Sequence, residues 1–596
     1  MKTLIIALNS KYIHSALGAW YLKASCGSEC GEVKVLEYTI NDDSGAILSS
    51  IYRERPDVAA FSCHIWNIRQ VLGLVSNLKK VLPELIIVLG GPEVSYDSQE
   101  TLAANNDIDY IIVGEGEAAF PKLVACLNGG EGSPSPEAIE GLCFRSTGGT
   151  CLNASGFIRE LDSLPSPYTT QMLEAVSGRI VYFESSRGCP FSCSYCLSST
   201  FEGVRYFSLE RVRRELTMLF DAGVRQVKFV DRTFNCSKAR AMEIFRHIVG
   251  LYRLRTDEEG GRPEINFHFE AAADLFDDEM LELLAQAPVG LIQLEIGVQT
   301  VNAAALEAID RRTDTERLCR NVRKLRETGN INLHLDLIAG LPFEDFASFR
   351  TSFDAVYGLS PHQLQLGFLK LLKGTRIRRQ AALHGYACTD CPPYEILSSK
   401  YLGYAEIIEL KGMEGLVDRY YNSGRFMSTL RYLLRFFGSP FDFYLAFFRF
   451  NLSKGSSARL PAALKGLYAL LSEFAEGVPG CDAAAVKEFM RLDFLASEGP
   501  GALPAALAGQ AGEGFRDSCY AFLKNEENVK RWLPGFAGIP AKVIYKKVHF
   551  EIFNLDFTSG PPAFAPDRQT VLLFDCSARD RVSGLYGYSV PDKLLP

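Results

Sequence analysis

Three cysteines stand close together in the stretch Arg187-Gly188-Cys189-Pro190-Phe191-Ser192-Cys193-Ser194-Tyr195-Cys196, which has the spacing CxxxCxxC. It follows a strand-like apolar run at 180–183. For 16 cysteines among 596 residues, random placement predicts only about 0.01 such spacings. A short loop with a glycine and a proline can wrap around a metal cluster. The spacing therefore predicts three thiolate ligands of a 4Fe-4S cluster, whose fourth iron is free to bind a small chelating ligand.

There are two other interpretations of the cysteines. A zinc site would take a fourth ligand nearby, and free cysteines also occur as buried core residues. The glycine before the motif and the aromatic residue inside it favour the iron–sulfur cluster.

The stretch RGCPFSCSYC resembles the motif of the radical S-adenosylmethionine (SAM) enzymes. In that family the methionine amino and carboxylate groups of SAM bind the fourth iron, and reductive cleavage of SAM releases a 5′-deoxyadenosyl radical. The resemblance implies that Cys189, Cys193 and Cys196 hold the cluster and that Tyr195 lies beside the adenine. It also implies an electron donor of the flavodoxin or ferredoxin type.

Length and composition indicate the number of domains and argue against several other classes of protein. A chain of 596 residues predicts three or four domains, and 47% hydrophobic with 22% charged residues is typical of globular ones. The net charge of -8 argues against general nucleic-acid binding. Scattered cysteines suit a reducing compartment. The apolar run at 1–8 reads as a buried strand rather than a signal peptide, and no apolar stretch predicts a transmembrane segment. We expect a cytoplasmic protein.

Residues 1–145 alternate short apolar runs with helical patterns, which predicts a Rossmann-like parallel sheet with helices on both faces. The expected strands are 3–8, 33–37, 58–62, 86–89 and 110–113. Ligands of such sheets bind at the carboxyl ends of the strands. Ser62, Gly90-Gly91-Pro92-Glu93 and Gly114-Glu115-Gly116-Glu117 stand at such ends. NAD is a poor candidate, because no GxGxxG follows the first strand.

Ahead of the cysteine motif, this domain resembles the cobalamin-binding domain of cobalamin-dependent radical SAM enzymes. That family has a serine loop after its third strand and a glycine pair after its fourth, and Ser62 and Gly90-Gly91 match these places. The Asp-x-His-x-x-Gly motif, which supplies a cobalt ligand in other corrinoid enzymes, is absent. The corresponding loop 9–18 contains His14, which either ligates cobalt or makes local polar contacts.

Strand–helix alternation returns after a connector at 146–175, within a Gly-, Ser- and Pro-rich stretch that predicts one small hairpin near 142–152. Residues 176–385 carry six expected strands, at 180–184, 226–230, 266–270, 292–297, 332–337 and 363–368. They agree with the partial (β/α)₆ TIM barrel of the radical SAM family. Catalytic groups of such barrels lie at the carboxyl ends of the strands.

Two acidic residues of the barrel are candidates for SAM contact. The family's glycine-rich GGE motif is missing, and Asp231 stands in its place. Asp231 either accepts a hydrogen bond from the SAM amino group or caps the end of its strand. Glu270 alternates with apolar neighbours and is expected to point into the barrel. A carboxylate there can accept from the ribose hydroxyls or bind the methionine ammonium.

The last strands of the barrel resemble further SAM-binding motifs of the family. Gly297 would let the adenosine approach closely, and Gln299 would supply a polar contact. Ile338 and Gly340 belong to a sixth-strand motif whose apolar residues flank the adenine.

Residues 386–596 resemble a subgroup of the family that carries a C-terminal domain of unknown function. The region reads as mainly helical, with terminal strand-like runs at 543–557 and 570–575. Its aromatic-rich segment at 431–450 could bind an apolar substrate or a membrane surface, but packing of helices into a core is the commoner explanation.

The resemblance implies a cobalamin-dependent radical SAM enzyme with three cofactors: a 4Fe-4S cluster, SAM and cobalamin. The expected reaction is methyl transfer to an unactivated position. One alternative is a cyclisation, rearrangement or oxidation that uses cobalamin without methyl transfer. Others are an enzyme whose Rossmann-like domain holds no cobalamin, and a non-catalytic cobalamin or redox sensor. The sequence does not identify the substrate.

Overall fold

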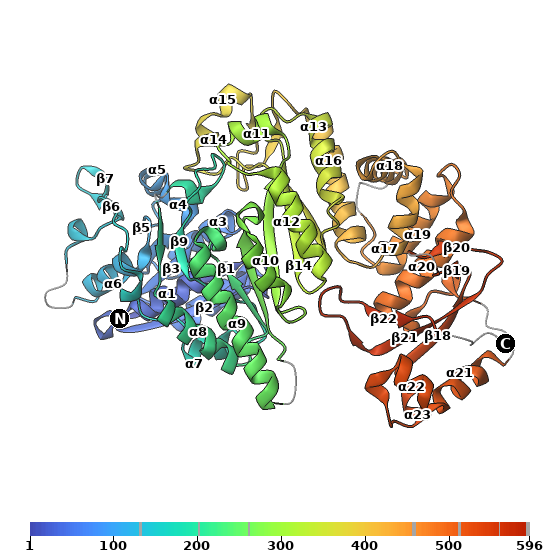
Figure 1. Ribbon diagram of the computed structural model, residues 1–596. Helices are drawn as coiled ribbons and strands as arrows, with labels where there is room; N and C mark the ends of the chain where they lie inside the picture. The colour runs from blue at the N-terminus through green and yellow to red at the C-terminus, as the bar shows by residue number, and fades with distance from the viewer. Residues whose placement is uncertain are drawn as a thin grey trace.

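The computed structural model describes residues 1–129, 134–200, 203–259, 263–455, 460–509, 514–558 and 561–591. Two parallel sheets follow one another along the chain, and a mainly helical region comes after them (Figure 1). Figure 1 shows the N-terminal sheet in blue on the left, the second sheet in green at the centre and the C-terminal region in orange on the right. Residues 130–133 of the predicted connector stretch lie outside the described residues.

The first sheet confirms the five predicted N-terminal strands. Its parallel strands are, in spatial order, β2 (Glu32–Thr39), β1 (Lys2–Asn9), β3 (Val58–Ser62), β4 (Ile86–Gly90) and β5 (Tyr110–Ile112). Helices α1 (Leu17–Ser25) and α6 (Gly116–Leu127) pack on one face, and α2 (Ser44–Glu54) and α3 (Ile68–Val81) pack on the other. The strand order reverses between β1 and β3, which is where doubly wound sheets bind ligands.

The predicted hairpin is present but extends the first sheet. Strands β6 (Leu142–Ser146) and β7 (Gly149–Leu152) pair antiparallel, and β6 pairs antiparallel with β5. The boundary expected at residue 145 therefore falls inside this hairpin. The physical reason is burial: Leu142, Cys143 and Phe144 complete the core of the first domain and cover the edge that β5 would otherwise expose.

The second sheet confirms the six strands predicted for the barrel, all of them parallel. In spatial order they are β15 (Gln363–Phe368), β14 (Asn332–Ala339), β13 (Ile292–Gln299), β12 (Asn266–Ala271), β11 (Gln226–Phe229) and β8 (Val181–Phe183). Burial alternates along β13 and β14: apolar side chains pack outward against helices, and half-buried, mostly polar ones point inward. In the described pairing β8 and β15 stay apart at the two ends of the sheet, so the barrel is open between them.

The C-terminal region is rich in helix, as predicted. Its main helices are α16 (Tyr404–Leu416), α18 (Pro440–Ser453), α19 (Leu464–Glu476) and α20 (Ala483–Glu498). Aromatic side chains of α18 are buried, which favours the core-packing interpretation of that segment. Strand β18 (Val548–Phe553) lies in the first predicted run, and β21 (Thr570–Arg579) begins with the second and extends four residues past it. Strand β22 (Tyr586–Ser589) was not predicted.

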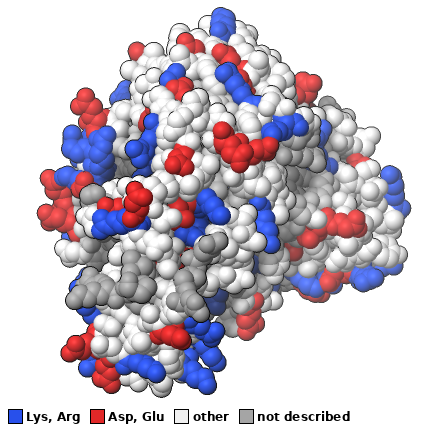
Figure 2. Space-filling view, turned by 90° about the vertical axis from the view of Figure 1, so that its right-hand side faces the viewer, with Lys and Arg blue, Asp and Glu red and all other residues white. Residues whose placement is uncertain are grey.

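The surface over the C-terminal region carries mixed charge. Figure 2 views the molecule from this side and shows basic and acidic side chains intermingled over a largely uncharged surface. In the part of the chain that the structure describes, no helix combines the length and the apolar character needed to cross a bilayer.

Candidate active site

The cysteine loop begins at Gly188, where any larger residue would strain the backbone. Strand β9 (Ser186–Gly188) pairs antiparallel with β10 (Val204–Tyr206). Gly188 has a φ of 102°, and a Cβ atom there would lie 2.2 Å from the carbonyl oxygen of Gly203. Only glycine adopts this conformation readily and allows so close an approach. The chain therefore turns sharply just before the first cysteine.

The spacing of the three cysteine sulfurs argues against a zinc site. Among the described residues, the only trio of His, Cys, Asp or Glu ligand atoms within 4.8 Å of one another comes from Glu295, His334 and Asp336. At least two of the three cysteine sulfurs therefore lie more than 4.8 Å apart, whereas the ligands of a tetrahedral zinc–sulfur site lie roughly 3.8 Å apart. Wider spacing suits thiolates that bind separate corners of a four-iron cluster.

Arg311 links the cysteine loop to the carboxyl end of β13. Its guanidinium group lies 3.8 Å from the sulfur of Cys193 and donates a 2.5 Å hydrogen bond to the carbonyl oxygen of Gly297. Burial raises the pKa of the Cys193 thiol, and the charge of Arg311 opposes this shift. Arg311 could not be predicted from the sequence, because it lies in a loop outside any recognised motif.

Two buried polar atoms near this point lack a partner among the described residues: Gln299 Oε1 and Arg311 Nε. Gln299 follows a bulge in β13 and has a φ of 70°, which is rare for a residue other than glycine. A Cβ atom at Gly297 would lie 2.2 Å from the side-chain nitrogen of Gln299. The structure thus brings Cys193, Gly297, Gln299 and Arg311 together around polar atoms that a ligand such as SAM could satisfy.

Asp231 has the environment of a strand-end cap. Its buried carboxylate accepts hydrogen bonds from the backbone N–H of Ser185 (3.0 Å) and from the hydroxyls of Ser185 (2.6 Å) and Ser186 (2.5 Å). These donors occupy both of its oxygens, so the cap is favoured over a contact with SAM. The next residue, Arg232, is exposed, and the hydroxyl of Thr233 lies 3.6 Å from the sulfur of Cys189.

Glu270 lies half-buried on the inner face of β12, and it has no hydrogen bond or ion pair with any described residue. Burial raises its pKa to about 7, and the nearby carboxylates of Glu295 and Asp336 add to the shift. The positive charge of Arg232 opposes the rise. An unpaired carboxyl group in this position is available to a ligand inside the barrel.

The structure corrects the expectation for Gly340. This residue is buried with a φ of 90°, and a Cβ atom there would lie 1.9 Å from the side chain of Ile396. Tyr386 donates a 2.8 Å hydrogen bond to its carbonyl oxygen. A larger residue at position 340 would clash with the C-terminal segment that packs on it. Because Gly340 is buried under this segment, it presents no surface to an adenine. Ile338 stays half-buried on the inner face of β14.

At the carboxyl edge of the first sheet, Ser62 contacts an aromatic stack. Its hydroxyl lies 3.0 Å from Nε2 of His64, whose ring stacks on Trp66 at 4.2 Å. Burial lowers the pKa of His64 to about 4, so the ring is neutral at pH 7. Trp66 is 46% exposed and donates a 3.1 Å hydrogen bond to the carbonyl oxygen of Leu8. No role for Trp66 was predicted from the sequence.

Gly90 and Gly91 differ in whether a larger residue would fit at each position. Gly91 has a φ of 106°, and a Cβ atom there would lie 2.5 Å from the carbonyl oxygen of Cys63. The turn alone therefore requires Gly91. A Cβ atom at Gly90 would make only ordinary contacts, the nearest at 3.7 Å. Gly90, Ser62 and Ala7 are neighbours in register on one face of the sheet, and these three small residues mark the place that we call the slot.

His14 contacts the barrel. Its Nδ1 lies 2.7 Å from the hydroxyl of Tyr182 on β8, and Ser15 donates a 2.8 Å hydrogen bond to the carbonyl oxygen of Ile180. Burial and the charge of Lys228 lower the pKa of His14. The structure thus gives His14 the polar contact that stood as the alternative to cobalt ligation.

Acidic loops at the carboxyl edge of the first sheet bind cations of the barrel. Arg187, just before the first cysteine, lies 2.5 Å from Glu117 and 3.3 Å from Glu115. Lys373 lies 3.3 Å from the buried carboxylate of Glu93. These glutamates, which the sequence placed at a ligand site, instead hold the ligand-binding edge of the first sheet against the barrel.

Ion pairs line the inner face of the barrel. Glu295 Oε2 lies 3.0 Å from the Lys228 ammonium and 2.7 Å from His268 Nε2, and these partners, working against burial, hold the pKa of Glu295 well below its usual range. On the next strand His334 lies 3.1 Å from Asp336. Burial opposes protonation of His334, but the hydrogen bond and charge of Asp336 raise its pKa overall.

Three family models match consecutive segments of the chain. The B12 binding domain matches residues 3–124, the radical SAM superfamily matches 183–356, and a protein family of unknown function, DUF4080, matches 382–574. The 2-(S-pantetheinyl)-carbapenam-3-carboxylate methyltransferase of Streptantibioticus cattleyicolor is 26% identical over 353 residues, which are 56% of this chain and 50% of the relative. An anaerobic magnesium-protoporphyrin IX monomethyl ester cyclase of Synechocystis is 27% identical over 263 residues, 43% of this chain and 50% of the relative.

A solved structure shares the fold. It is that of OxsB, a cobalamin-dependent S-adenosylmethionine radical enzyme with aqua-cobalamin bound, and it has a TM-score of 0.57 at 14% identity. The match covers 83% of this chain and 79% of OxsB. By contrast, the chain spans about half the length of the curated relatives that it matches.

The matched domains place this chain in the cobalamin-dependent radical SAM family. Within that class, it belongs to the group that carries a C-terminal DUF4080 domain. The cofactors of the class are a 4Fe-4S cluster, SAM and cobalamin. The widely spaced sulfurs, the unpartnered Gln299 and Arg311 atoms and the slot at Gly90 fit these three groups in turn.

Proposed function

We propose that this enzyme transfers a methyl group to an unactivated position of its substrate. The observation that carries the proposal is the docking of the first sheet: its carboxyl edge meets the barrel through His14, Glu93 and Glu117. A cofactor held at that edge would face the carboxyl ends of the barrel strands, where the proposed SAM site lies. The methyltransferase among the relatives supports the same reaction.

We propose that Cys189, Cys193 and Cys196 hold the cluster. When bound, the cluster supplies the electron that splits SAM into methionine and the 5′-deoxyadenosyl radical, and cobalamin carries the methyl group. Tyr195 borders the adenine in this proposal. Arg311 stabilises negative charge near Cys193, because a buried guanidinium lies 3.8 Å from that sulfur.

The remaining SAM contacts in the proposal come from three strand ends. Gln299 accepts a hydrogen bond from SAM at its unpartnered Oε1, and Ile338 packs against the adenine. Glu270 accepts hydrogen bonds from the ribose hydroxyls or pairs with the methionine ammonium. At the end of β11 the proposal assigns the polar contact with SAM to Arg232 instead of Asp231. The Asp231 carboxylate already accepts hydrogen bonds from Ser185.

In this proposal, residues at the crevice between β1 and β3 would hold cobalamin. The slot beside Gly90 and Ser62 accepts its nucleotide tail, and the exposed face of Trp66 offers an apolar contact to a flat ring. His14 does not ligate cobalt, because its Nδ1 is held by Tyr182 and the loop is fixed to β8.

A cyclisation or related reaction without methyl transfer is the second candidate, and the cyclase among the relatives favours it. Product analysis separates the two. The reduced, fully reconstituted enzyme is incubated with SAM and a metabolite extract of its source organism. Methyl transfer predicts S-adenosylhomocysteine and 5′-deoxyadenosine in equal amounts, because each turnover uses one SAM as methyl donor and one as radical source. Formation of 5′-deoxyadenosine alone would favour the second candidate, and formation of neither would support a sensor.

A further inference from the structure

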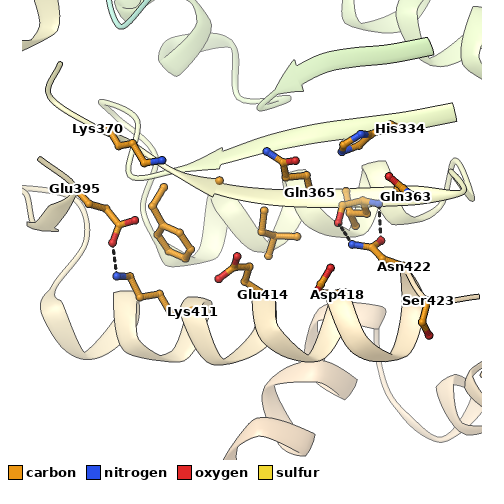
Figure 3. A pocket seen from close by; sticks show the side chains of 14 residues that line it. His334, Gln363, Gln365, Lys370, Glu395, Lys411, Glu414, Asp418, Asn422 and Ser423 are labelled. Atoms are coloured by element: carbon orange, nitrogen blue, oxygen red, sulfur yellow. Dashed lines mark hydrogen bonds and ion pairs between the residues drawn. The ribbon is translucent and has the colours of Figure 1, made fainter. Parts of the chain in front are cut away.

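A cavity of about 630 Å³ lies between the edge of the barrel and the DUF4080 region. Figure 3 shows β14 and β15 on one side of it and the helix α16, with the turn that follows, on the other. The cavity is lined by His334, Gln363 and Gln365 from the strands and by Lys411, Glu414 and Asp418 from the helix. In Figure 3 the side chain of Gln365 points away from the helix. The lining is dominated by charged and amide groups.

The helix is attached to the barrel at one end of this cavity. The amide group of Asn422 accepts a 2.8 Å hydrogen bond from the N–H of Leu364 and donates a 3.0 Å bond to its carbonyl oxygen. Asn422 thereby satisfies both backbone groups of an edge-strand residue, as a neighbouring strand would. The DUF4080 region is therefore built as a wall along the open side of the barrel.

The cavity continues onto the inner face of the barrel through His334. His334 lines the cavity and also lies 3.1 Å from Asp336, which shares that inner face with Glu270 and Glu295. Through His334 the cavity therefore borders the interior of the barrel, in which the proposed radical chemistry takes place.

The charges of the helix wall are also incompletely paired. Lys411 forms an ion pair with Glu395. Within the described parts of the chain, the side chains of Glu414 and Asp418 have no ion pair or hydrogen bond, although they lie on successive turns and both line the cavity. Both side chains are exposed at the mouth of the cavity. Burial and the charges of Asp418 and Glu395 raise the pKa of Glu414, and the charges of Lys411 and Lys370, which also line the cavity, oppose this rise. A cation bound between the two carboxylates would remove this repulsion.

We propose that this cavity is the substrate site and that the substrate is a small polar amine, whose ammonium group pairs with Glu414 and Asp418. The amides of Gln363 and Gln365 and the ring of His334 bind its other polar groups. The location rests on the proposed radical function, because it uses the inner face of the barrel as the place of reaction. The amine selectivity rests on the charges alone. An apolar substrate would leave these charged groups desolvated and unpaired.

Binding of a cationic probe tests the amine selectivity without turnover. Spermidine is titrated calorimetrically, under argon, into protein loaded with cluster and cobalamin, with citrate and sucrose as anionic and neutral probes. We expect spermidine alone to bind. The double variant Glu414→Gln/Asp418→Asn is expected to bind it at least about tenfold more weakly, because two charge-assisted contacts are lost. Iron content and circular dichroism check that this variant is folded.

A matched pair of exposed carboxylates serves as the control. Glu473→Gln/Glu476→Gln removes two charges from α19, in the same domain and outside the cavity lining, and is expected to bind spermidine like the unaltered protein. Equal weakening in both double variants would mean nonspecific attraction and overturn the proposal, as would absence of spermidine binding to the unaltered protein. Loss of SAM cleavage or of corrinoid retention would instead refute the proposed function, and neither result depends on spermidine.

Discussion

Replacing Glu270 by glutamine tests how the barrel binds SAM. The carboxyl group lies on the inner face of β12, it has no partner among the described residues, and burial raises its pKa to about 7. Below pH 7 the group is mostly protonated and no longer offers a charged acceptor to SAM. We therefore expect the affinity for SAM to rise with pH through 7 in the unaltered enzyme.

The size of the effect follows from this pKa. With a pKa of about 7, the ionised fraction of Glu270 rises from about 0.1 at pH 6 to about 0.9 at pH 8, which is roughly a ninefold gain in affinity if only the carboxylate binds SAM. At pH 8, Glu270→Gln loses a charge-assisted hydrogen bond of about 1.5–3 kcal/mol, so SAM should bind roughly 10- to 150-fold more weakly.

Equilibrium dialysis of radiolabelled SAM against both proteins between pH 6 and 8, with the cluster reconstituted, provides the measurement. The ratio of the two dissociation constants cancels the titration of SAM itself and of other groups. That ratio is expected to grow about ninefold over the range, while the iron content of the two proteins stays equal. Parallel curves, with a ratio independent of pH, would refute the assignment of Glu270 to SAM and leave it a structural role.

Three further outcomes follow from the site. The triple Cys→Ala variant of the CxxxCxxC motif should lose the bound iron, about four per chain, and the thiolate-to-iron absorption; an unchanged spectrum would move the cluster elsewhere. Gly90→Leu should abolish corrinoid retention by filling the slot in the first sheet, whereas Gly73→Leu, at a glycine with open space around it, should retain corrinoid; equal retention by both would contradict the slot. His14→Ala should leave corrinoid binding and the cobalt spectrum largely intact, and a shifted spectrum would make His14 the cobalt ligand.

The strands could be predicted because their signal is local. In a parallel sheet covered on both faces, each strand is a short apolar run, as at 58–62, and the strand can be read without knowing its neighbours. The inward direction of Glu270 likewise follows from alternation along a single strand. The signal of the cysteine loop is local too, since all three cysteines lie within residues 187–196.

Roles that depend on distant partners could not be predicted in this way. Asp231 is occupied by Ser185, 46 residues earlier, and Gly340 is covered by Ile396 from the next domain. Arg311 reaches Cys193 across 118 positions. In each case the deciding contact joins segments that only the fold brings together, and no spacing within the sequence reports it.

The same distant contacts connect the two cofactor sites. Arg187 immediately precedes the cysteine loop and pairs with Glu115 and Glu117, which follow the last parallel strand of the first sheet. The three side chains are largely buried, and buried charges that lose their partners are costly. The cysteine loop and the carboxyl edge of the first sheet are therefore fixed relative to each other. The proposed reaction requires the methyl donor and the short-lived radical to be held close together. These buried ion pairs would hold the two cofactor sites in that arrangement.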